Sequence, residues 1–289
     1  MRGTIALDID GTLTTGSLSL PEKTIKYLTS LENTGWRILF VTGRTFRSGC
    51  KALKDVPFPF YFAVQNGAIL FEMPSQRIIS KKYLDRSIFI EMEAICSTQP
   101  SDFVVYSGFE NDDQCYFRPH EFSPPLRDYL QRRVTAYNEV WHPLESYDKM
   151  AIDVFPSIKC FGLFPSAKEL AGVIEKRLGL HVPVIRDPFS EELFTTPDEK
   201  YFVVQATHPE ISKGQALLDL IAALGKQGKI IAAGDDYNDI SMLAVADVAV
   251  VMATAPDDLL KKADIIAPSA AQEGIITGLE AAIKACNLL

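Results

Sequence analysis

Two aspartates, Asp8 and Asp10, stand one residue apart directly after an apolar run at residues 4–7, and Gly11 follows them. Like charges this close repel each other, so each carboxylate is stabilised by a cation or by sharing a proton. One carboxylate can accept a phosphoryl group as an aspartyl-phosphate, and its neighbour can act as general acid and then general base. The spacing therefore predicts a metal-assisted site in which Asp8 attacks phosphorus and Asp10 moves protons.

Two more polar motifs follow apolar runs in the same way. The sequence Thr-Gly-Arg at residues 42–44 follows the run 38–41, and Gly-Asp-Asp-Tyr-Asn-Asp at residues 234–239 follows the run 230–233. Ligands of open parallel sheets bind beyond the carboxyl ends of the strands. We therefore expect these motifs to converge with Asp8 at one edge of one sheet, although they lie almost the whole chain apart.

Each motif offers a group that suits phosphate chemistry. The hydroxyl of Thr42 and the unobstructed backbone N–H of Gly43 can bind phosphate oxygens. Lys213, at a predicted helix start, can balance the charge of the transferring group. Mg²⁺ prefers one or two carboxylates together with waters and substrate oxygens, so Asp8 and Asp235 fit one ion.

Asn238 and Asp239 are expected to orient phosphate, water or metal without being the main ligands.

Taken singly, each motif also fits an ordinary structural role. An Asp-Gly pair is common in turns, a lysine is usually solvated, and three acids in residues 235–239 can begin a helix. Their order along the chain and their positions after strands favour one shared site.

The elements that must position these residues alternate between strand and helix. Continuous apolar runs are typical of parallel strands that are covered on both faces. Pro21 is expected at the first helical position, Ser212 and Gln215 are expected to form a capping box, and Asn66-Gly67 indicates a hairpin turn. The expected strands are 4–7, 38–41, 61–64, 68–71, 230–233, 248–251 and 265–266. The expected helices start at 21, include 46–53, run from about 212 to 224, pass through 242–243, open at 256 and, for the last one, end near 286.

The pattern changes to helices and paired strands between residues 83 and 208. Consecutive strands joined by short loops are usually antiparallel, so this segment reads as an α+β insertion. We therefore predict an α/β fold with a Rossmann-like, mostly parallel sheet, built from residues 1–82 and 209–289, and an inserted domain at 83–208. The expected pieces of the insertion are 88–96, 103–106, 115–118, 126–134, 151–155, 159–164, 167–178, 182–185 and 201–205.

These residues resemble, in order, the four motifs of the haloacid dehalogenase superfamily. Residues 8–12 correspond to the first motif, residues 42–44 to the second, Lys213 to the third, and Gly234-Asp235 with Asn238-Asp239 to the fourth. The nearest subgroup is the Cof-type phosphatases, which carry a large α/β cap between the second and third motifs. The segments 65–68 (Gln-Asn-Gly-Ala), 212–214 (Ser-Lys-Gly) and 272–274 (Gln-Glu-Gly) are similar to that subgroup as well. The resemblance implies phosphate contacts and Mg²⁺ ligands. The phosphate contacts are Thr42, Gly43, Lys213 and Asn238, and the metal ligands are Asp8, the backbone carbonyl of Asp10, and Asp235.

The chain departs from the family pattern at two places. Residues 253–255 read Ala-Thr-Ala where relatives usually have Gly-Asn-Ala, and Asp236 stands where a small residue is common; we assign Asp236 no role. Substrate choice is expected from the cap, since a lid excludes water and contacts the leaving group. Arg118, His120 and Arg186 are candidates for an anionic or hydroxylated substrate, or are ordinary surface residues.

Composition excludes several other classes. The chain has 289 residues, a net charge of −8 and 47% hydrophobic residues, without a basic, aromatic-interleaved run typical of nucleic-acid binding. No apolar run reaches the roughly 18–20 residues of a membrane span. The five scattered cysteines lack zinc spacing, and the four histidines lie in the middle of the chain, so a zinc site or a histidine triad is not expected. We expect a cytoplasmic protein with reduced thiols.

The sequence thus predicts a Mg²⁺-dependent phosphatase that hydrolyses a small phosphorylated metabolite, a sugar phosphate or similar ester, through an aspartyl-phosphate. A phosphomutase or phosphotransferase of the phosphomannomutase type is an alternative that the core motifs do not separate. A non-catalytic phospho-acceptor, as in receiver domains, is the third possibility. Asp10 argues against it, because a stable acyl phosphate needs no acid–base partner. The sequence does not determine the oligomeric state.

Overall fold

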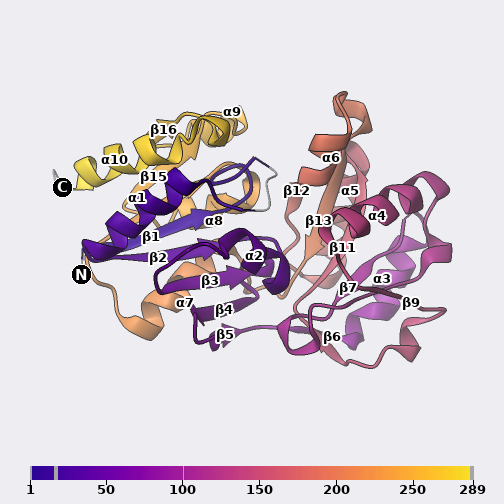
Figure 1. Cartoon of the computed structure of the whole chain (residues 1–289). Coiled ribbons are helices and arrows are strands. Elements are labelled where there is room, and N and C mark those ends of the chain that lie inside the picture. The colour runs from indigo at the N-terminus through magenta and orange to yellow at the C-terminus, as the bar shows by residue number, and fades with distance from the viewer. Residues whose placement is uncertain (1, 16–18, 100, 287–289) are drawn as a thin grey trace. The chain divides into compact units, whose positions relative to one another are not determined.

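The computed structural model describes residues 2–15, 19–99 and 101–286 and divides the chain into two compact units (Figure 1). The first unit comprises Met1–Arg44, Gly49–Lys81 and Ile211–Leu289, and the second comprises Thr45–Ser48 and Lys82–Glu210. The second unit is therefore largely one continuous insertion in the sequence of the first. No helix in the described parts of the chain has the length and hydropathy needed to cross a membrane.

The first unit is built on an eight-stranded sheet in the order β16-β15-β14-β1-β2-β3-β4-β5. Its strands from β16 to β3 pair in parallel, and β4 and β5 extend the sheet in antiparallel pairing. The bounds are β1 Gly3–Asp8, β2 Trp36–Val41, β3 Phe60–Val64, β4 Ile69–Met73, β5 Arg77–Lys81, β14 Lys229–Gly234, β15 Val248–Met252 and β16 Ile265–Ala267. The predicted parallel sheet core and its α/β class are confirmed.

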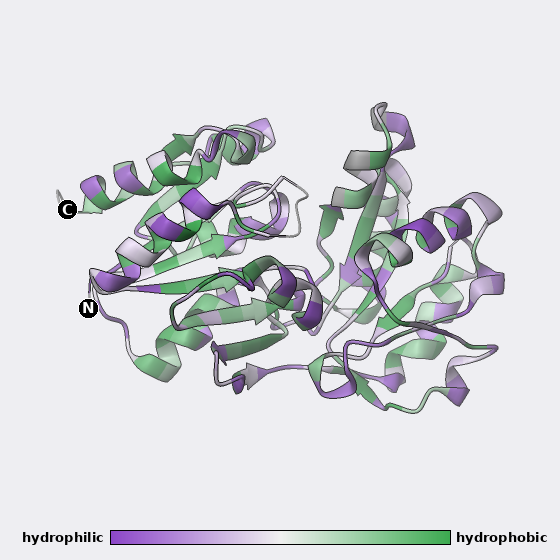
Figure 2. Cartoon of the chain, viewed as in Figure 1, coloured by the Kyte–Doolittle hydropathy of each residue, from purple (hydrophilic) through white to green (hydrophobic). Residues whose placement is uncertain are grey.

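Helices cover both faces of this sheet, and most strand residues are hydrophobic (Figure 2). Helices α7 and α8, together with α9, share a buried cluster with residues such as Ala6, Leu39 and Ala232. Helix α10 packs on the opposite face, because a Cβ at Gly278 would meet the side chains of Ala267 and Val250. The helices are α1 Glu22–Asn33, α2 Phe46–Leu53, α7 Lys213–Leu224, α8 Ile240–Leu243, α9 Asp257–Leu260 and α10 Ile275–Cys286.

Strand β1 lies at the point where the strand order reverses. The chain runs from β1 through β2 to β3 on one side, and from β14 through β15 to β16 on the other. Asp8 is in register with Val41 of β2, and Leu7 is in register with Ala233 of β14. A reversal of this kind leaves a crevice beyond the carboxyl ends of the strands, which is where ligands of doubly wound folds bind.

Two local expectations in this unit need correction. Pro21 does not begin a helix: it is the N-cap residue, in extended conformation, and α1 starts at Glu22. The hydroxyl of Ser212 does accept the backbone N–H of Gln215, but the Gln215 side chain donates to Asp219 instead of returning to the cap. At the start of α7 the Asp219 carboxylate competes with the cap for the Gln215 side chain.

The second unit has a six-stranded sheet in the order β12-β13-β11-β7-β8-β9 and a two-stranded pair, β10-β6. All pairs are antiparallel except β8 with β9. The strands are β6 Leu84–Asp85, β7 Val104–Tyr106, β8 Cys115–Phe117, β9 Trp141–Pro143, β10 Val154–Phe155, β11 Ser157–Leu163, β12 Val184–Arg186 and β13 Tyr201–Ala206. The strand predicted at 151–155 is therefore much shorter, because only two of its residues find a partner.

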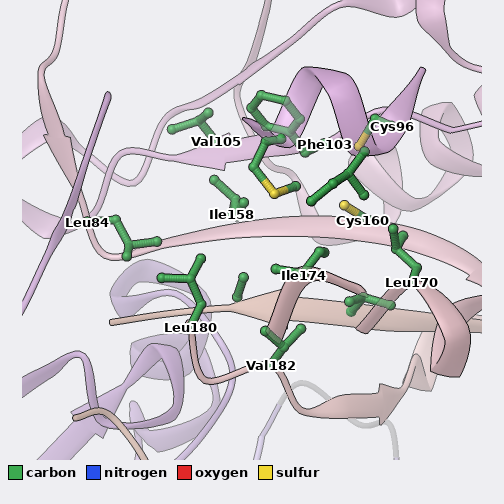
Figure 3. Close-up of a cluster of buried hydrophobic side chains, with 14 of the residues drawn as sticks. Leu84, Cys96, Phe103, Val105, Ile158, Cys160, Leu170, Ile174, Leu180 and Val182 are labelled. Atoms are coloured by element: carbon green, nitrogen blue, oxygen red, sulfur yellow. The ribbon is translucent and has the colours of Figure 1, made fainter. Parts of the chain in front are cut away.

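Hydrophobic layers hold helices to both faces of this sheet. The helices are α3 Phe89–Cys96, α4 Pro124–Tyr137, α5 Phe164–Leu178 and α6 Pro188–Leu193. Helices α3 and α5 pack on one face in a cluster that includes Phe103, Ile158 and Ile174 (Figure 3). Leu126 and Leu130 of α4 pack on the other face against Val104 and Phe161. Each such buried side chain contributes about 1.5–3 kcal/mol relative to exposure.

Candidate active site

The three polar motifs come together at the carboxyl ends of three adjacent strands of the first unit. Asp8 is the last residue of β1, Gly234 is the last residue of β14, and Thr42 follows the end of β2. Because β14, β1 and β2 are neighbours in the sheet, these positions share one edge. The convergence that the sequence predicted is what the structure shows.

Lys213 links the third motif to the first and fourth. Its ammonium Nζ lies 2.5 Å from Oδ1 of Asp8 and 2.6 Å from Oδ1 of Asp239. The three side chains are buried, with 1%, 5% and 0% of the side chain exposed. The hydroxyl of Ser212 caps the helix that presents Lys213 by accepting the N–H of Gln215 at 3.0 Å. The ammonium of Lys213 therefore ties Asp8 of the first strand to Asp239 of the loop after β14.

The charges of Asp8 and Lys213 shift each other's pKa. Burial raises the pKa of the Asp8 carboxyl to about 7; the charge of Lys213 lowers it, and the carboxylates of Asp239 and Asp10 raise it. Burial acts to lower the pKa of Lys213, but the carboxylates of Asp239 and Asp8 outweigh it and raise that pKa overall. Lys213 therefore stays charged, and an added cation beside Asp8 would favour the ionised carboxylate.

Asp239 holds the loop after β14, which carries the fourth motif, by hydrogen bonds to its backbone. Its Oδ2 accepts the backbone N–H groups of Asp235 at 2.9 Å and Asp236 at 3.0 Å, while its Oδ1 accepts from Lys213. Asp236, to which the sequence assigned no role, is the N-cap of the short 3-10 helix Tyr237–Asp239 and forms a capping box with Asp239. This local structure holds the loop after β14 and aims Asp235 toward Asp8.

The donors present fit a divalent cation. Carboxylate oxygens of Asp8, Asp235 and Asp239 lie within 4.8 Å of one another. Asp239 already accepts three hydrogen bonds, so Asp8 and Asp235 would be the carboxylate ligands of such an ion. Gly11 makes room for Asp235: its φ is +84°, and a Cβ there would lie 2.2 Å from Oδ2 of Asp235. Buried carboxylate oxygens are what Mg²⁺ binds in proteins.

Arg44 forms a contact that the sequence reading missed. Its Nε donates to Oδ2 of Asp10 at 2.8 Å, and its second terminal nitrogen donates to Oδ1 at 2.5 Å. This two-point pair fixes the carboxylate of Asp10, whose side chain remains 23% exposed. Arg44 belongs to the Thr-Gly-Arg motif, so its position was noticed, but sequence gives no sign of which carboxylate it binds.

The predicted phosphate ligands Thr42 and Asn238 lie in a hydrogen-bonded loop cluster. Thr42 is fully buried, and its Oγ1 accepts the N–H of Arg44 at 3.1 Å. The Nδ2 of Asn238 donates to Oδ1 of Asn66 at 3.0 Å. Gly43 lies between Thr42 and Arg44 in the same loop. The structure thus gathers the predicted ligands of the core motifs in one unit.

The three candidates for substrate recognition in the second unit are not gathered in this way. Arg118 is bound within its own unit, to Asp102 through two hydrogen bonds of 2.9 and 3.0 Å and to Glu93 at 2.6 Å. His120 lies 3.4 Å from Glu121 and is mostly exposed. Arg186 is the last residue of β12. The contacts of Arg118 indicate a structural role, because both carboxylates already neutralise it.

Comparisons with known proteins show the family to which the chain belongs. The model of the haloacid dehalogenase-like hydrolase family matches residues 5–279. The chain is 23% identical over 290 residues to the pyridoxal phosphate phosphatase YbhA of Escherichia coli (strain K12), covering 91% of this chain and 92% of that protein.

Solved structures with the same fold cover the chain from end to end. A haloacid dehalogenase-like hydrolase from Bacteroides thetaiotaomicron superposes with a TM-score of 0.73 at 19% identity, covering 97% of this chain and 99% of that chain. The subclass IIB sugar phosphatase BT4131 gives 0.72 at 19% identity, covering 97% and 98%. Because the family model matches almost the whole chain, the protein belongs to the haloacid dehalogenase-like hydrolases.

Proposed function

We propose that this hydrolase is a Cof-type phosphatase that hydrolyses a small phosphorylated metabolite, such as a sugar phosphate or similar ester, with Mg²⁺ and through an aspartyl-phosphate on Asp8. The observation that carries the proposal is the ion pair between Lys213 and Asp8. It lies beside Asp235, where the strand order of the sheet reverses. Lys213 binds Oδ1 of Asp8, which leaves Oδ2 as the atom that attacks phosphorus.

Asp8, Asp235 and the backbone carbonyl of Asp10 would hold the ion. Mg²⁺ supplies positive charge that offsets the repulsion between the Asp8 carboxylate and a phosphate dianion. On the protein side, Lys213 balances the charge of the transferring group. Thr42, Gly43 and Asn238 bind the phosphate oxygens, and Asp239 fixes Lys213 and the loop that carries Asp235.

Asp10 moves the protons. In its protonated form it donates to the oxygen of the leaving alcohol, and the resulting carboxylate then takes a proton from the water that attacks the phosphorylated Asp8. Arg44 fixes the orientation of the Asp10 carboxyl group through two hydrogen bonds.

We propose that residues 83–208 act as the cap that selects the leaving group, and that the site works on freely diffusing substrates instead of proteins, nucleic acid or membranes. The similar proteins YbhA and BT4131 are named for pyridoxal phosphate and for sugar phosphates, respectively, and both are small phosphate esters. We also propose a cytoplasmic location, in keeping with the scattered cysteines of the sequence.

The test is turnover of phosphorylated metabolites and of an activated aryl phosphate with and without Mg²⁺. Asp8→Asn is expected to reduce turnover below detection while the circular dichroism spectrum stays that of the folded protein, because an amide is a far weaker nucleophile. Asp219→Asn, on the same helix as Lys213 but bonded to Ser80 and Gln215, serves as the matched control. Near-normal activity of Asp8→Asn would refute the nucleophile. A rearranged sugar phosphate without release of phosphate would identify a mutase instead.

A further inference from the structure

The turn between β3 and β4 has an unusual backbone. Gln65, Asn66 and Gly67 follow one another with φ values of 52°, 57° and 103°. Left-handed backbone is uncommon for residues other than glycine, and Asn is among the residues that tolerate it best. The side chains of Gln65 and Asn66 are nevertheless buried, with 1% exposure each. A strained and buried turn at the edge of a candidate active site raises the question of what its side chains do.

The backbone of this turn holds two of the catalytic motifs. The N–H of Asn66 donates to the carbonyl of Thr42, and the N–H of Gln65 donates to the carbonyl of Arg44, both at 2.9 Å. Gly67 packs against the start of α7, where a Cβ would lie 2.7 Å from the carbonyl oxygen of Ser212, the residue before Lys213. The turn therefore contacts the loop of the second motif and the helix start of the third.

The side chain of Asn66 reaches the fourth motif. The Nδ2 of Asn238 donates to Oδ1 of Asn66 at 3.0 Å, across a sequence separation of 172 residues. The Oδ1 of Asn238 is buried and has no hydrogen-bond partner among the residues that the structure describes. An amide nitrogen carries two hydrogens, so the bond to Asn66 fixes one and leaves the other for a ligand oxygen.

We propose that Asn66 is a positioning residue for phosphate binding: by accepting a hydrogen bond from Asn238, it fixes the amide of Asn238 in the orientation that presents its second N–H to a phosphate oxygen. The inference rests on the proposed function, in which Asn238 binds phosphate. Without Asn66 the amide of Asn238 can rotate and present its oxygen, an acceptor, to an anion that is itself an acceptor. Pre-oriented donors of this kind bind a charged group more strongly than donors that must first reorganise.

Backbone preference alone could also select Asn at this position, so the test must separate the side chain from the φ angle. Asn66→Gly does this, because glycine adopts a φ of 57° without a steric cost while losing the amide. Gln76→Gly is the matched control: Gln76 is an exposed residue with a φ of 55° in the turn between β4 and β5. It reports what a glycine at a left-handed position does to stability.

The experiment combines Asn66→Gly with Asn238→Ala in a double-mutant cycle. It measures kcat/KM for an activated aryl phosphate with Mg²⁺, and binding of inorganic phosphate by its shift of the thermal unfolding midpoint. Asn66→Gly is expected to lower kcat/KM about tenfold and to weaken phosphate binding about tenfold, with Gln76→Gly unchanged in both. In the Asn238→Ala background the same change is expected to have no further effect, because Asn66 then has no amide to position.

Full activity and phosphate binding in Asn66→Gly would overturn the proposal. So would an undiminished effect of Asn66→Gly in the Asn238→Ala background, since Asn66 would then act by another route. A native protein that turns over no phosphate ester would instead reject the proposed function. Phosphate binding, which needs no turnover, would still decide whether Asn66 positions Asn238.

Discussion

Each unit of the molecule buries one lysine almost completely, and the two lysines behave in opposite ways. Lys213 of the first unit is 1% exposed and Lys159 of the second is 5% exposed. The pKa of Lys213 is raised. The pKa of Lys159 is lowered to about 8, first by burial and then by the charge of Arg133, although Glu139 acts to raise it.

The difference lies in the neighbours. The ammonium of Lys213 touches two carboxylates, at 2.5 and 2.6 Å. That of Lys159 lies 4.4 Å from the ring centroid of Tyr106, in a region where Arg133 is paired with Asp187 and Glu139. Burial acts to lower the pKa of both lysines; the carboxylates of Asp239 and Asp8 outweigh it at Lys213, whereas the charge of Arg133 adds to it at Lys159. The first unit thus keeps a buried lysine charged.

The largest expected effect comes from Lys213→Met, which removes the buried ammonium of the first unit. The change leaves Asp8 and Asp239 buried without their common cation, and we expect a loss of about 3–5 kcal/mol in the free energy of unfolding at pH 8. The loss should shrink toward pH 5, where Asp8, with a pKa of about 7, takes up a proton. Turnover should fall by at least about 100-fold.

Chemical denaturation and the rate with an aryl phosphate measure these two effects. Lys226→Met, at an exposed position, is the control and should resemble the native protein. A Lys213→Met protein with native stability at pH 8 would show that the two carboxylates do not depend on the ammonium.

Lys159→Met should act in the opposite direction. Methionine keeps most of the volume and removes a charge whose burial is unfavourable, so the free energy of unfolding at pH 7 is expected to rise by about 3 kcal/mol, the equivalent of the pKa change from 10.5 to about 8. The gain should shrink as pH rises from 8 toward 10.5. In that range native Lys159 is neutral when folded but still protonated when unfolded, so native stability rises with pH.

Urea unfolding of both proteins between pH 7 and pH 10 measures this gain. A Lys159→Met protein that is less stable than the native one would show that the contacts of the ammonium outweigh its desolvation, and the two lysines would then differ less than their pKa directions suggest.

The smallest effect concerns Mg²⁺ itself. Between about pH 4 and pH 7 the folded protein holds a proton on Asp8 that the unfolded chain has lost, so the metal-free protein loses stability as pH rises through this range. Mg²⁺ needs the ionised carboxylate and is expected to stabilise the fold by about 1.4 kcal/mol at ten times its dissociation constant, more at pH 8 than at pH 5.5.

Thermal unfolding with and without Mg²⁺ checks this, with Asp235→Asn as the variant that should lose most of the response. An equal response in Asp235→Asn would place the ion away from the carboxylates of Asp8 and Asp235.

Much of the first unit could be predicted because its signals are local. The apolar runs before Asp8, Thr42 and Gly234 identify buried strands without any knowledge of their partners, and the parallel sheet rule then places the residues that follow them at one edge. The second unit was harder to predict. Its strands are short, as β10 with two residues shows, and their pairing depends on partners far away in sequence.

The contacts that complete the site were beyond the sequence. Arg44 pairs with Asp10 across 34 positions and Asn238 with Asn66 across 172 positions. Arg118, a candidate substrate ligand by sequence, is neutralised in the fold by Asp102 and Glu93. A charged or amide side chain has several possible partners, and its choice follows from distances that only the folded chain sets.

The sequence by itself determined which functional groups are available: the residues that carry carboxylate, ammonium and hydroxyl groups. It also showed that several of them lie at the ends of buried strands. The tertiary structure decided which of those groups touch, which are neutralised and which carry a shifted pKa. The physical reason is that side-chain type and strand propensity are properties of short segments. Electrostatic interactions and hydrogen bonds depend on separations of a few ångströms, and the chain fixes these only when β14, β1 and β2 lie side by side.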